Sequence, residues 1–247
     1  MIRGRTLIAL IGIGLFAAMP AGAADQRPPG VLVLPAKAIA ATSATAEMLD
    51  PAAVVWNNVS ASPLHLNRTP PLYAIGPADD GERPTASARA LRLANGAAVV
   101  RIRWADATDD RARISAQYAD AGAPHVYQRH SEGTGAFGDA VCVAIPRTRG
   151  PHATYPSMMM GDAAKPVEMY FWRAGEGFQR LDAHGRATPT VATAPVEGRF
   201  AREADGWAVT FVLPNMPRRT PLAFAIWNGG KQDRDGLKFY SLWHEIE

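Results

Sequence analysis

Two segments of this 247-residue chain place a large apolar side chain at every second position, which is the pattern of a β-strand with one buried face. In Ala97–Trp104 two arginines lie between the apolar residues, and Trp207–Leu213 repeats the design. Asn95-Gly96 precedes the first segment and Asp205-Gly206 the second, and both pairs are typical of tight hairpin turns. The pattern predicts paired strands and restricts the fold to classes built on extended sheets.

Short apolar runs elsewhere indicate more strands, and the 22 glycines and 20 prolines favour turns over long helices. Helical periodicity is weak: Ala36–Met48 is interpreted as loop or a short helix, and Arg111–Asp120 as one or two helical turns. We therefore expect a mainly β fold, a single-domain antiparallel β-sandwich with long loops and few short helices. The further expected strands are Val31–Leu34, Ser62–Leu66, Ala140–Ile145, Val167–Trp172, Leu222–Trp227 and Phe239–Ile246.

The first residues have the three parts of a secretory signal peptide. Met1–Arg5 is basic, Leu7–Met19 is apolar, and Ala21-Gly-Ala23 has the small residues of a cleavage site. The apolar run is too short to span a bilayer, and no later segment of the sequence is a candidate span. We expect a signal peptide at 1–23, a β-sandwich domain at 24–247, and export to a bacterial periplasm.

The charge of the chain argues against nucleic acid as a partner. The formal charge is +3, and loss of Arg3 and Arg5 with the signal peptide would lower it to about +1. The sequence also lacks the run of basic residues interleaved with aromatic ones that is typical of nucleic-acid-binding surfaces.

Cys142 is the single cysteine of the chain. It lies in an apolar, strand-like run, where we expect a buried and inert thiol. With one cysteine, the sequence has neither an internal disulfide nor the Cys-x-x-Cys-His pattern that attaches a c-type haem. Any haem would therefore be held without a covalent link, as b-type.

Two segments combine residues that are unusual as packing elements but suitable as iron ligands. Tyr155–Asp162 contains three consecutive methionines before a Gly-Asp turn, and Gly236–Trp243 offers one lysine among apolar and aromatic residues. A thioether is a soft axial ligand of haem iron and raises its reduction potential. A methionine cluster is, however, more often adaptable core filling, and a lone lysine on a strand is usually solvated. The residues alone leave both interpretations open.

Several motifs, taken in chain order, cover most of the chain from Asp50 to Trp243, although no single one is diagnostic. They are Asp50-Pro51 with Trp56, Arg101–Asp106, Phe137–Val141, Met160–Ala163, Tyr170–Ala174, Asp205–Trp207, Ala223–Gly229, and Lys238 with Ser241 and Trp243. The ordered set resembles the haem b-binding gamma subunits of periplasmic type II DMSO-reductase-family molybdoenzymes. Ethylbenzene dehydrogenase, dimethylsulfide dehydrogenase, and the chlorate and selenate reductases belong to that family.

The resemblance implies a β-sandwich that holds one haem b per chain, with the iron ligated by one methionine and one lysine. By their positions in the motifs, these ligands are Met160 and Lys238. The neighbouring Met158 and Met159 leave the choice of thioether open, with Met158 the main alternative. His152 lies close to the methionines and is the other alternative, because imidazole is a frequent haem ligand.

Lys238 can bind iron only as the free amine, so its surroundings must favour loss of the proton. Trp227, Phe239 and Trp243 are candidates for an apolar, aromatic shell that does this. Two protein ligands leave no vacant position on the iron. We expect six-coordinate, low-spin iron in an electron carrier, and no catalysis by this chain alone.

The resemblance also implies partner subunits. They are a catalytic subunit with a molybdenum cofactor and an iron–sulfur subunit, and a soluble c-type cytochrome is the further electron-transfer partner. This chain would relay single electrons between these proteins in the periplasm, while the substrate chemistry takes place in the catalytic subunit.

The main alternative is an exported β-sandwich module that binds a ligand such as carbohydrate without haem, with Trp104, Trp172 or Trp227 as aromatic platforms. A hydrolytic function is disfavoured, because the sequence contains no Gly-x-Ser-x-Gly motif. The acidic pairs Asp79-Asp80 and Asp109-Asp110 are interpreted as solvated turn residues rather than as calcium ligands or acid–base groups.

Overall fold

The computed structural model describes residues 30–69, 80–111, 137–150, 154–186 and 188–247. The signal peptide expected at 1–23 lies outside these residues, as does the expected helical segment beyond residue 111. Residues 31–247 form one unit by their internal contacts. The fold is mainly β, as the sequence predicts, and its strands form two sheets.

The larger sheet has nine strands within the described residues, and its central members are β13, β7 and β8. In spatial order the main path is β1 (Leu32–Leu34), β15 (His244–Ile246), β13 (Pro221–Trp227), β7 (Ala140–Pro146), β8 (Val167–Arg173), β9 (Gly177–Ala183) and β10 (Thr190–Val191), with β14 (Phe239–Ser241) pairing β13 and β4 (Leu66–Arg68) pairing β14.

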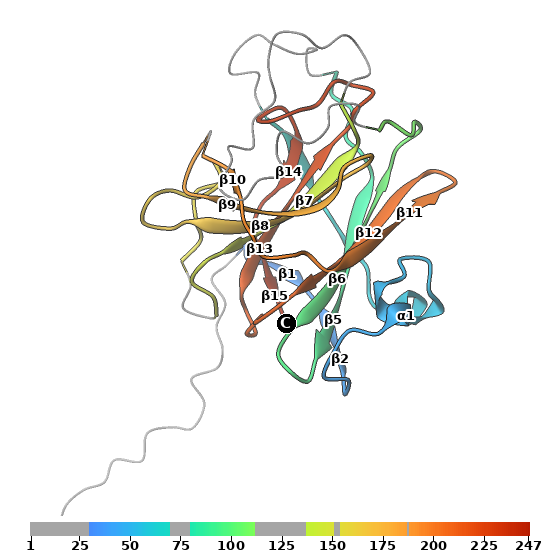
Figure 1. Cartoon of the computed structure of the whole chain (residues 1–247), viewed down its shortest axis with the longest axis vertical. Coiled ribbons are helices and arrows are strands. Elements are labelled where there is room, and N and C mark those ends of the chain that lie inside the picture. Colours follow the sequence, from blue (N-terminus) through green and yellow to red (C-terminus); the bar gives the residue numbers. More distant parts are fainter. Residues whose placement is uncertain (1–29, 70–79, 112–136, 151–153, 187) are drawn as a thin grey trace, which may run out of the picture. The chain divides into compact units, whose positions relative to one another are not determined.

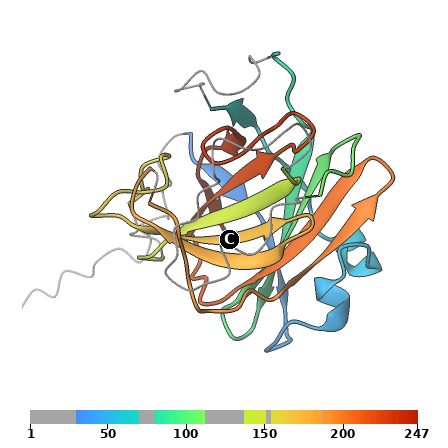
Figure 2. The ribbon, with the colours of Figure 1, turned by 45° about the horizontal axis from the view of Figure 1, so that its top comes forward.

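The smaller sheet has six strands within the described residues, and β6 and β12 pair along their full lengths in its middle. Its spatial order is β11 (Gly198–Glu203), β12 (Gly206–Leu213), β6 (Ala98–Ala105), β5 (Ala86–Leu93) and β2 (Ala36–Ile39), with β3 (Ser62–Pro63) pairing β5. Figure 2 shows that the strands of the two sheets run in clearly different directions.

Both sheets are mixed, which differs from the expected antiparallel sandwich. β1 pairs β15 in parallel, and β2 pairs β5 in parallel, while the other strand pairs of the described residues are antiparallel. Each parallel pair lies at an edge and joins an N-terminal strand to a distant part of the chain. Hairpin signals fix antiparallel neighbours only, so the local sequence gives no indication of these two pairings.

The two predicted hairpins are present. Gly96 has φ +83°, and the side-chain oxygen of Asn95 accepts a hydrogen bond of 2.9 Å from the backbone N–H of Ala97. In the second hairpin the turn lies one residue earlier than expected, and Gly206 is already the first residue of β12. A Cβ on Gly206 would lie 1.9 Å from the backbone oxygen of Trp104, so only glycine fits at this strand start.

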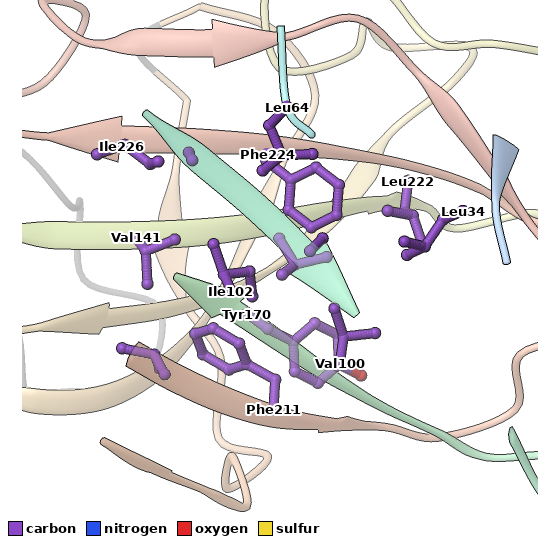
Figure 3. Packing of buried hydrophobic residues seen from close by; sticks show 14 of the residues in the cluster. Leu34, Leu64, Val100, Ile102, Val141, Tyr170, Phe211, Leu222, Phe224 and Ile226 are labelled. Atoms are coloured by element: carbon purple, nitrogen blue, oxygen red, sulfur yellow. The ribbon is translucent and has the colours of Figure 1, made fainter. Parts of the chain in front are cut away.

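The inner core lies between the sheets and consists of the side chains on their facing sides. Figure 3 shows Ile102 and Phe211 of the smaller sheet close to Val141 and Phe224 of the larger one. Each of these side chains is almost completely buried. Burial of a large apolar side chain contributes about 1.5–3 kcal/mol, so this layer supplies most of the stabilisation that holds the sheets together.

The outer face of the smaller sheet is covered by two short helices. They are α1 (Ala46–Leu49), which Thr45 caps by accepting a hydrogen bond from the Met48 N–H, and the 3₁₀ helix η1 (Val54–Asn58). Figure 1 shows α1 beside this sheet, on the side away from β8 and β9. Residues Ala36–Met48, which the sequence suggested as loop or a short helix, thus begin with the strand β2 and end within α1.

Arg101 lies on this covered face and is buried, whereas the sequence pattern placed it toward solvent. Its guanidinium donates to the backbone oxygen of Pro51 over 2.7 Å and to Glu203 over 2.8 Å. A buried charge of this kind requires such partners. α1 and η1 therefore convert an expected solvent face into a second buried layer.

The outer face of the larger sheet carries a second apolar layer, which we call the outer cluster. It contains mostly small residues on β7 and β13, mostly larger apolar residues on β8 and its neighbours, and partly buried residues of the methionine segment. Its members are Phe137, Ala140, Cys142, Ala144, Met158, Met160, Val167, Met169, Phe171, Leu181, Ala183, Val191, Ala223, Ala225, Trp227 and Trp243.

None of the helices in the described ranges has the length and apolar character needed to cross a membrane.

Replacement of Ile102 by alanine should lower the free energy of unfolding by about 2–5 kcal/mol, because a fully buried side chain leaves a cavity between the sheets. The matched control is Val54→Ala, whose side chain is 69% exposed, with an expected change of about 0.5 kcal/mol or less. Urea unfolding of both variants measures the difference. Equal destabilisation would contradict this placement of the inner core.

Candidate functional site

Lys238 lies directly before β14, and its backbone is fixed by the end of β4. Its N–H donates to the Thr69 hydroxyl oxygen over 2.9 Å, and its carbonyl oxygen accepts from the Thr69 N–H over 2.9 Å. The pairing of Phe239 with Arg68 continues this contact into the sheet. Lys238 is therefore held by a long-range strand pair, not by a flexible loop.

The amine of Lys238 is buried, and within the described part of the chain it forms no ion pair with a carboxylate. Nζ donates to the backbone oxygen of Asp235 over 3.4 Å and lies 5.4 Å from the centre of a Trp227 ring. Burial lowers the pKa of Lys238, and the nearby positive charge of Arg186 lowers it further, against opposing effects of Cys142 and Asp235. The site therefore makes loss of the proton easier than it is for a solvated lysine.

The loop before Lys238 is held by a buried ion pair. Arg68 donates two hydrogen bonds to Asp233, of 2.7 and 2.5 Å, and the Asp233 side chain is fully buried. Burial raises the pKa of Asp233 although Arg68 acts in the opposite direction. The indole N–H of Trp227 donates to the Asp235 oxygen over 3.1 Å, so Trp227 and Lys238 share one carbonyl as their acceptor.

Small side chains form the part of the outer cluster that lies over the central strands. Ala225 of β13 pairs with Cys142 of β7, which pairs with Phe171 of β8. Two residues further along each strand, Ala223 pairs with Ala144. Alternate residues of a strand share a face, so these alanines and the cysteine make a low, apolar surface beside Trp227 and Phe171, whose rings lie 5.5 Å apart.

The methionine segment forms a turn against this surface. The Gly161 N–H donates to the Ser157 oxygen over 2.9 Å, and Met160 has φ +66°, which is uncommon for a residue with a side chain. Met158 and Met160 are half-buried against the outer cluster, and Met159 is 45% exposed. Two of the three thioethers therefore face the cluster.

Two contacts attach this turn to neighbouring segments. The Trp243 indole N–H donates to the Pro156 oxygen over 3.0 Å, and the Gly185 N–H donates to the Met160 oxygen over 3.0 Å. The first joins the turn to the C-terminal strands, and the second joins it to the connection between β9 and β10. The methionines are held in place from both sides.

The structure brings most of the predicted site residues to one face. Met158, Met160, Trp227 and Trp243 belong to the outer cluster, and Lys238 reaches it through the Trp227 ring. Phe239 differs, because its side chain packs in the inner core. His152 lies outside the described residues.

The other lysines near the two segments, Lys165 and Lys231, lie at the surface. Lys165 is exposed, and Lys231 forms ion pairs of 2.7 Å with Asp80 and 2.6 Å with Glu82. Cys142 is buried, as expected, and burial raises the pKa of its thiol to about 12.

The chain is 29% identical to the chlorate reductase subunit gamma of Ideonella dechloratans over 253 aligned positions, covering 97% of this chain and 95% of that protein. It is 27% identical to a proposed respiratory nitrate reductase haem subunit of Haloferax mediterranei, covering 89% and 76%, and 27% identical to the dimethylsulfide dehydrogenase subunit gamma of Rhodovulum sulfidophilum, covering 78% and 72%. No family model matches the chain.

The chain is a homologue of these gamma and haem subunits of type II DMSO-reductase-family enzymes. The resemblance seen in the ordered motifs is thereby confirmed. Coverage is high in each comparison, so the similarity extends over the sandwich as a whole and is not limited to one loop.

Several residues that build this site were not predicted from the sequence. Arg68 and Asp233 are 165 positions apart, and each lies in an unremarkable polar segment. Thr69, which fixes the Lys238 backbone, is 169 positions from it. No local pattern links residues so far apart, and only the pairing of β14 with β4 brings them together.

Replacement of Asp233 by asparagine should destabilise the folded chain by about 3–5 kcal/mol, because it leaves the Arg68 charge buried without its partner. The control is Asp80→Asn, which removes one partner of the partly exposed Lys231, with an expected cost of about 1 kcal/mol or less. Denaturant unfolding compares the two variants. A similar small cost for both would contradict the role of the buried pair.

Proposed function

We propose that this chain is an exported b-type cytochrome subunit that relays single electrons within a molybdoenzyme complex. Its haem iron is ligated by Lys238 and by a methionine of the 158–160 segment, Met160 in first place. The haem supplies a one-electron couple, and the protein supplies the ligands and an apolar surrounding.

The observation that carries this proposal is the buried amine of Lys238. Lysine is seldom buried without a paired carboxylate, since burial disfavours its charged form. Here the amine lies against Trp227, at the margin of a cluster that also contains two thioethers. A neutral amine and a thioether are the donor set that the haem-subunit resemblance implies. The residues present therefore fit the group.

The small residues of the outer cluster support the same proposal. Ala144, Ala223, Ala225 and Cys142 place only small side chains at the centre of this face, and Trp227, Phe171 and the methionines belong to the same cluster. A flat, apolar ligand such as a porphyrin is suited to this type of surface. Water exclusion by the surrounding aromatic rings would keep the lysine deprotonated and the redox potential high.

Exposed apolar side chains border the proposed site and suit contact with a redox partner. Tyr155 is 38% exposed, Met159 45% and Leu242 53%, and they flank the buried Pro156–Trp243 contact. Electron transfer benefits from a partner that approaches close to the cofactor. By homology we assign the partners as a molybdenum-cofactor subunit with an iron–sulfur subunit, and a soluble c-type cytochrome, in the periplasm after removal of residues 1–23.

The alternative function, a carbohydrate-binding module, lacks its proposed platforms. Trp104 and Trp172 are fully buried in the inner core, and Trp227 is 7% exposed. A stacking platform must be open to its ligand. The aromatic residues singled out in the sequence are thus packing residues of the sandwich or members of the outer cluster.

Replacement of Lys238 by alanine should convert the six-coordinate, low-spin absorption spectrum of the haem protein to a five-coordinate, high-spin one, because one axial ligand is lost. Added methylamine should restore the low-spin bands, since it can occupy the space of the missing side chain. Lys231→Ala, which changes a surface lysine of the neighbouring loop, is the control and should leave the spectrum unchanged. An unchanged low-spin spectrum in Lys238→Ala would refute this ligand.

The three adjacent methionines allow a matched test of the thioether ligand. Met160→Ala should lose the ligand and lower the reduction potential, while Met158→Ala and the exposed Met159→Ala should keep low-spin spectra. Near-infrared magnetic circular dichroism, which reports thioether ligation of ferric haem, provides the measurement. Loss in Met158→Ala alone would move the assignment to Met158, and retention in all three variants would exclude methionine ligation.

A further inference from the structure

Three acidic side chains from two separate loops meet at the end of the sandwich where β6 ends and β7 begins. They are Asp106, Asp110 and Asp139, and each contributes a carboxylate oxygen to a group whose atoms all lie within 4.8 Å of one another. Asp139 is fully buried and Asp106 is 5% exposed. This group is separate from Lys238 and from the methionine segment.

Asp139 is held rigidly by three donors. Its Oδ1 accepts from the Gly229 N–H, and its Oδ2 accepts from the Asp110 N–H and from the Trp207 indole N–H, each over 2.9 Å. These bonds join the start of β7 to the start of β12 and to the loop after β13. The position of the carboxylate is therefore fixed by the fold.

Asp106 has one buried carboxylate oxygen that no N–H or hydroxyl of the described residues reaches. Its Oδ1 accepts from the backbone N–H and the hydroxyl of Thr108, each over 3.1 Å, but its buried Oδ2 has no hydrogen-bond donor among the described residues. A buried carboxylate oxygen without a partner is costly. The Asp106 and Asp139 carboxyls lie within hydrogen-bonding reach of each other, so the pair requires either a shared proton or a bound cation.

The basic side chains of the described residues near this group are engaged elsewhere. Arg111 pairs with Asp109 over 2.9 Å, and Arg202 donates to the backbone oxygen of Asp106, not to its carboxylate. Within the described ranges, the three carboxylates form no ion pair with lysine, arginine or histidine. Their charge is balanced by no side chain of the described chain.

Further oxygen atoms border the same space. A Cβ added to Gly230 would lie 2.8 Å from Asp110 Oδ2, 3.1 Å from Thr108 Oγ1 and 3.3 Å from Asn228 Oδ1. Gly230 thus allows oxygens from two loops to approach one another closely. The surroundings offer hard oxygen donors, and among the described residues they offer no sulfur or imidazole ligand.

We propose that Asp106, Asp110 and Asp139 bind one calcium ion, with water completing its coordination. Carboxylate oxygens are the preferred donors for this ion, which accepts irregular sets of about six to eight oxygens, whereas magnesium requires a nearly ideal octahedron. The ion would supply the missing partner of Asp106 Oδ2. It would also tie the end of β6 to the loop that continues from Gly229 to Lys238.

Isothermal titration calorimetry of the chelator-treated, purified full-length mature protein with calcium chloride tests the proposal. We expect one saturable site per chain, weaker binding of magnesium chloride by about tenfold or more, and a higher melting temperature with calcium. Asp110→Asn should weaken calcium binding by about tenfold or more, while the control Asp109→Asn, one residue away and paired with Arg111, should change it by less than about twofold.

Absence of saturable binding of calcium at concentrations up to about 10 mM would overturn the proposal and leave a proton shared by Asp106 and Asp139 as the balancing charge. Equal weakening by Asp109→Asn and Asp110→Asn would also overturn it. The melting-temperature shift of the unmodified protein provides a test that does not depend on the folding of either variant. The absorption spectrum should be the same with and without calcium, so this test is independent of the haem ligands.

Discussion

Strands β7, β8 and β13 carry apolar side chains on both faces, and the structure depends on covering both. The inner face is covered by the smaller sheet, through contacts such as Val141 and Phe224 with Ile102. The outer face has no second sheet in the described residues. It is bordered by the methionine turn, Trp227 and Trp243, with small residues in its centre. A sheet that is apolar on both sides requires two covers, and a bound apolar group is suited to be the second.

Lys238 gives this outer face a specific chemistry. Its backbone is fixed by Thr69, its amine is buried beside Trp227, and the loop before it is anchored by Asp233 and Arg68. Burial in this position lowers the pKa of Lys238 and so disfavours its charged form relative to a solvated lysine. The energetic cost of burying Lys238 is accounted for if the amine ligates a metal centre, and this links the packing of the sheet to the proposed electron transfer.

The sequence predicted the strands that alternate strictly or are strongly apolar, such as β6, β12 and β13, because their own residues determine which face is buried. β5 and β11 were missed: three of the buried residues of β5 are alanines, which give a weak apolar pattern, and no residue of the edge strand β11 is buried. The motifs also identified the residues that gather on the outer face.

Long-range contacts were not predictable: Arg68 with Asp233, and Asp106 with Asp139, come from segments that meet only through sheet pairing. The acidic pair at Asp110 was interpreted as a solvated turn for the same reason.

The central claim is that the outer face holds a non-covalent haem. Its most direct test is the absorption spectrum of the periplasmically expressed protein, oxidised and dithionite-reduced, followed by a pyridine haemochrome assay. The account predicts sharp low-spin bands, a b-type haemochrome, and about one haem per chain. A colourless protein obtained from haem-sufficient cells would contradict it.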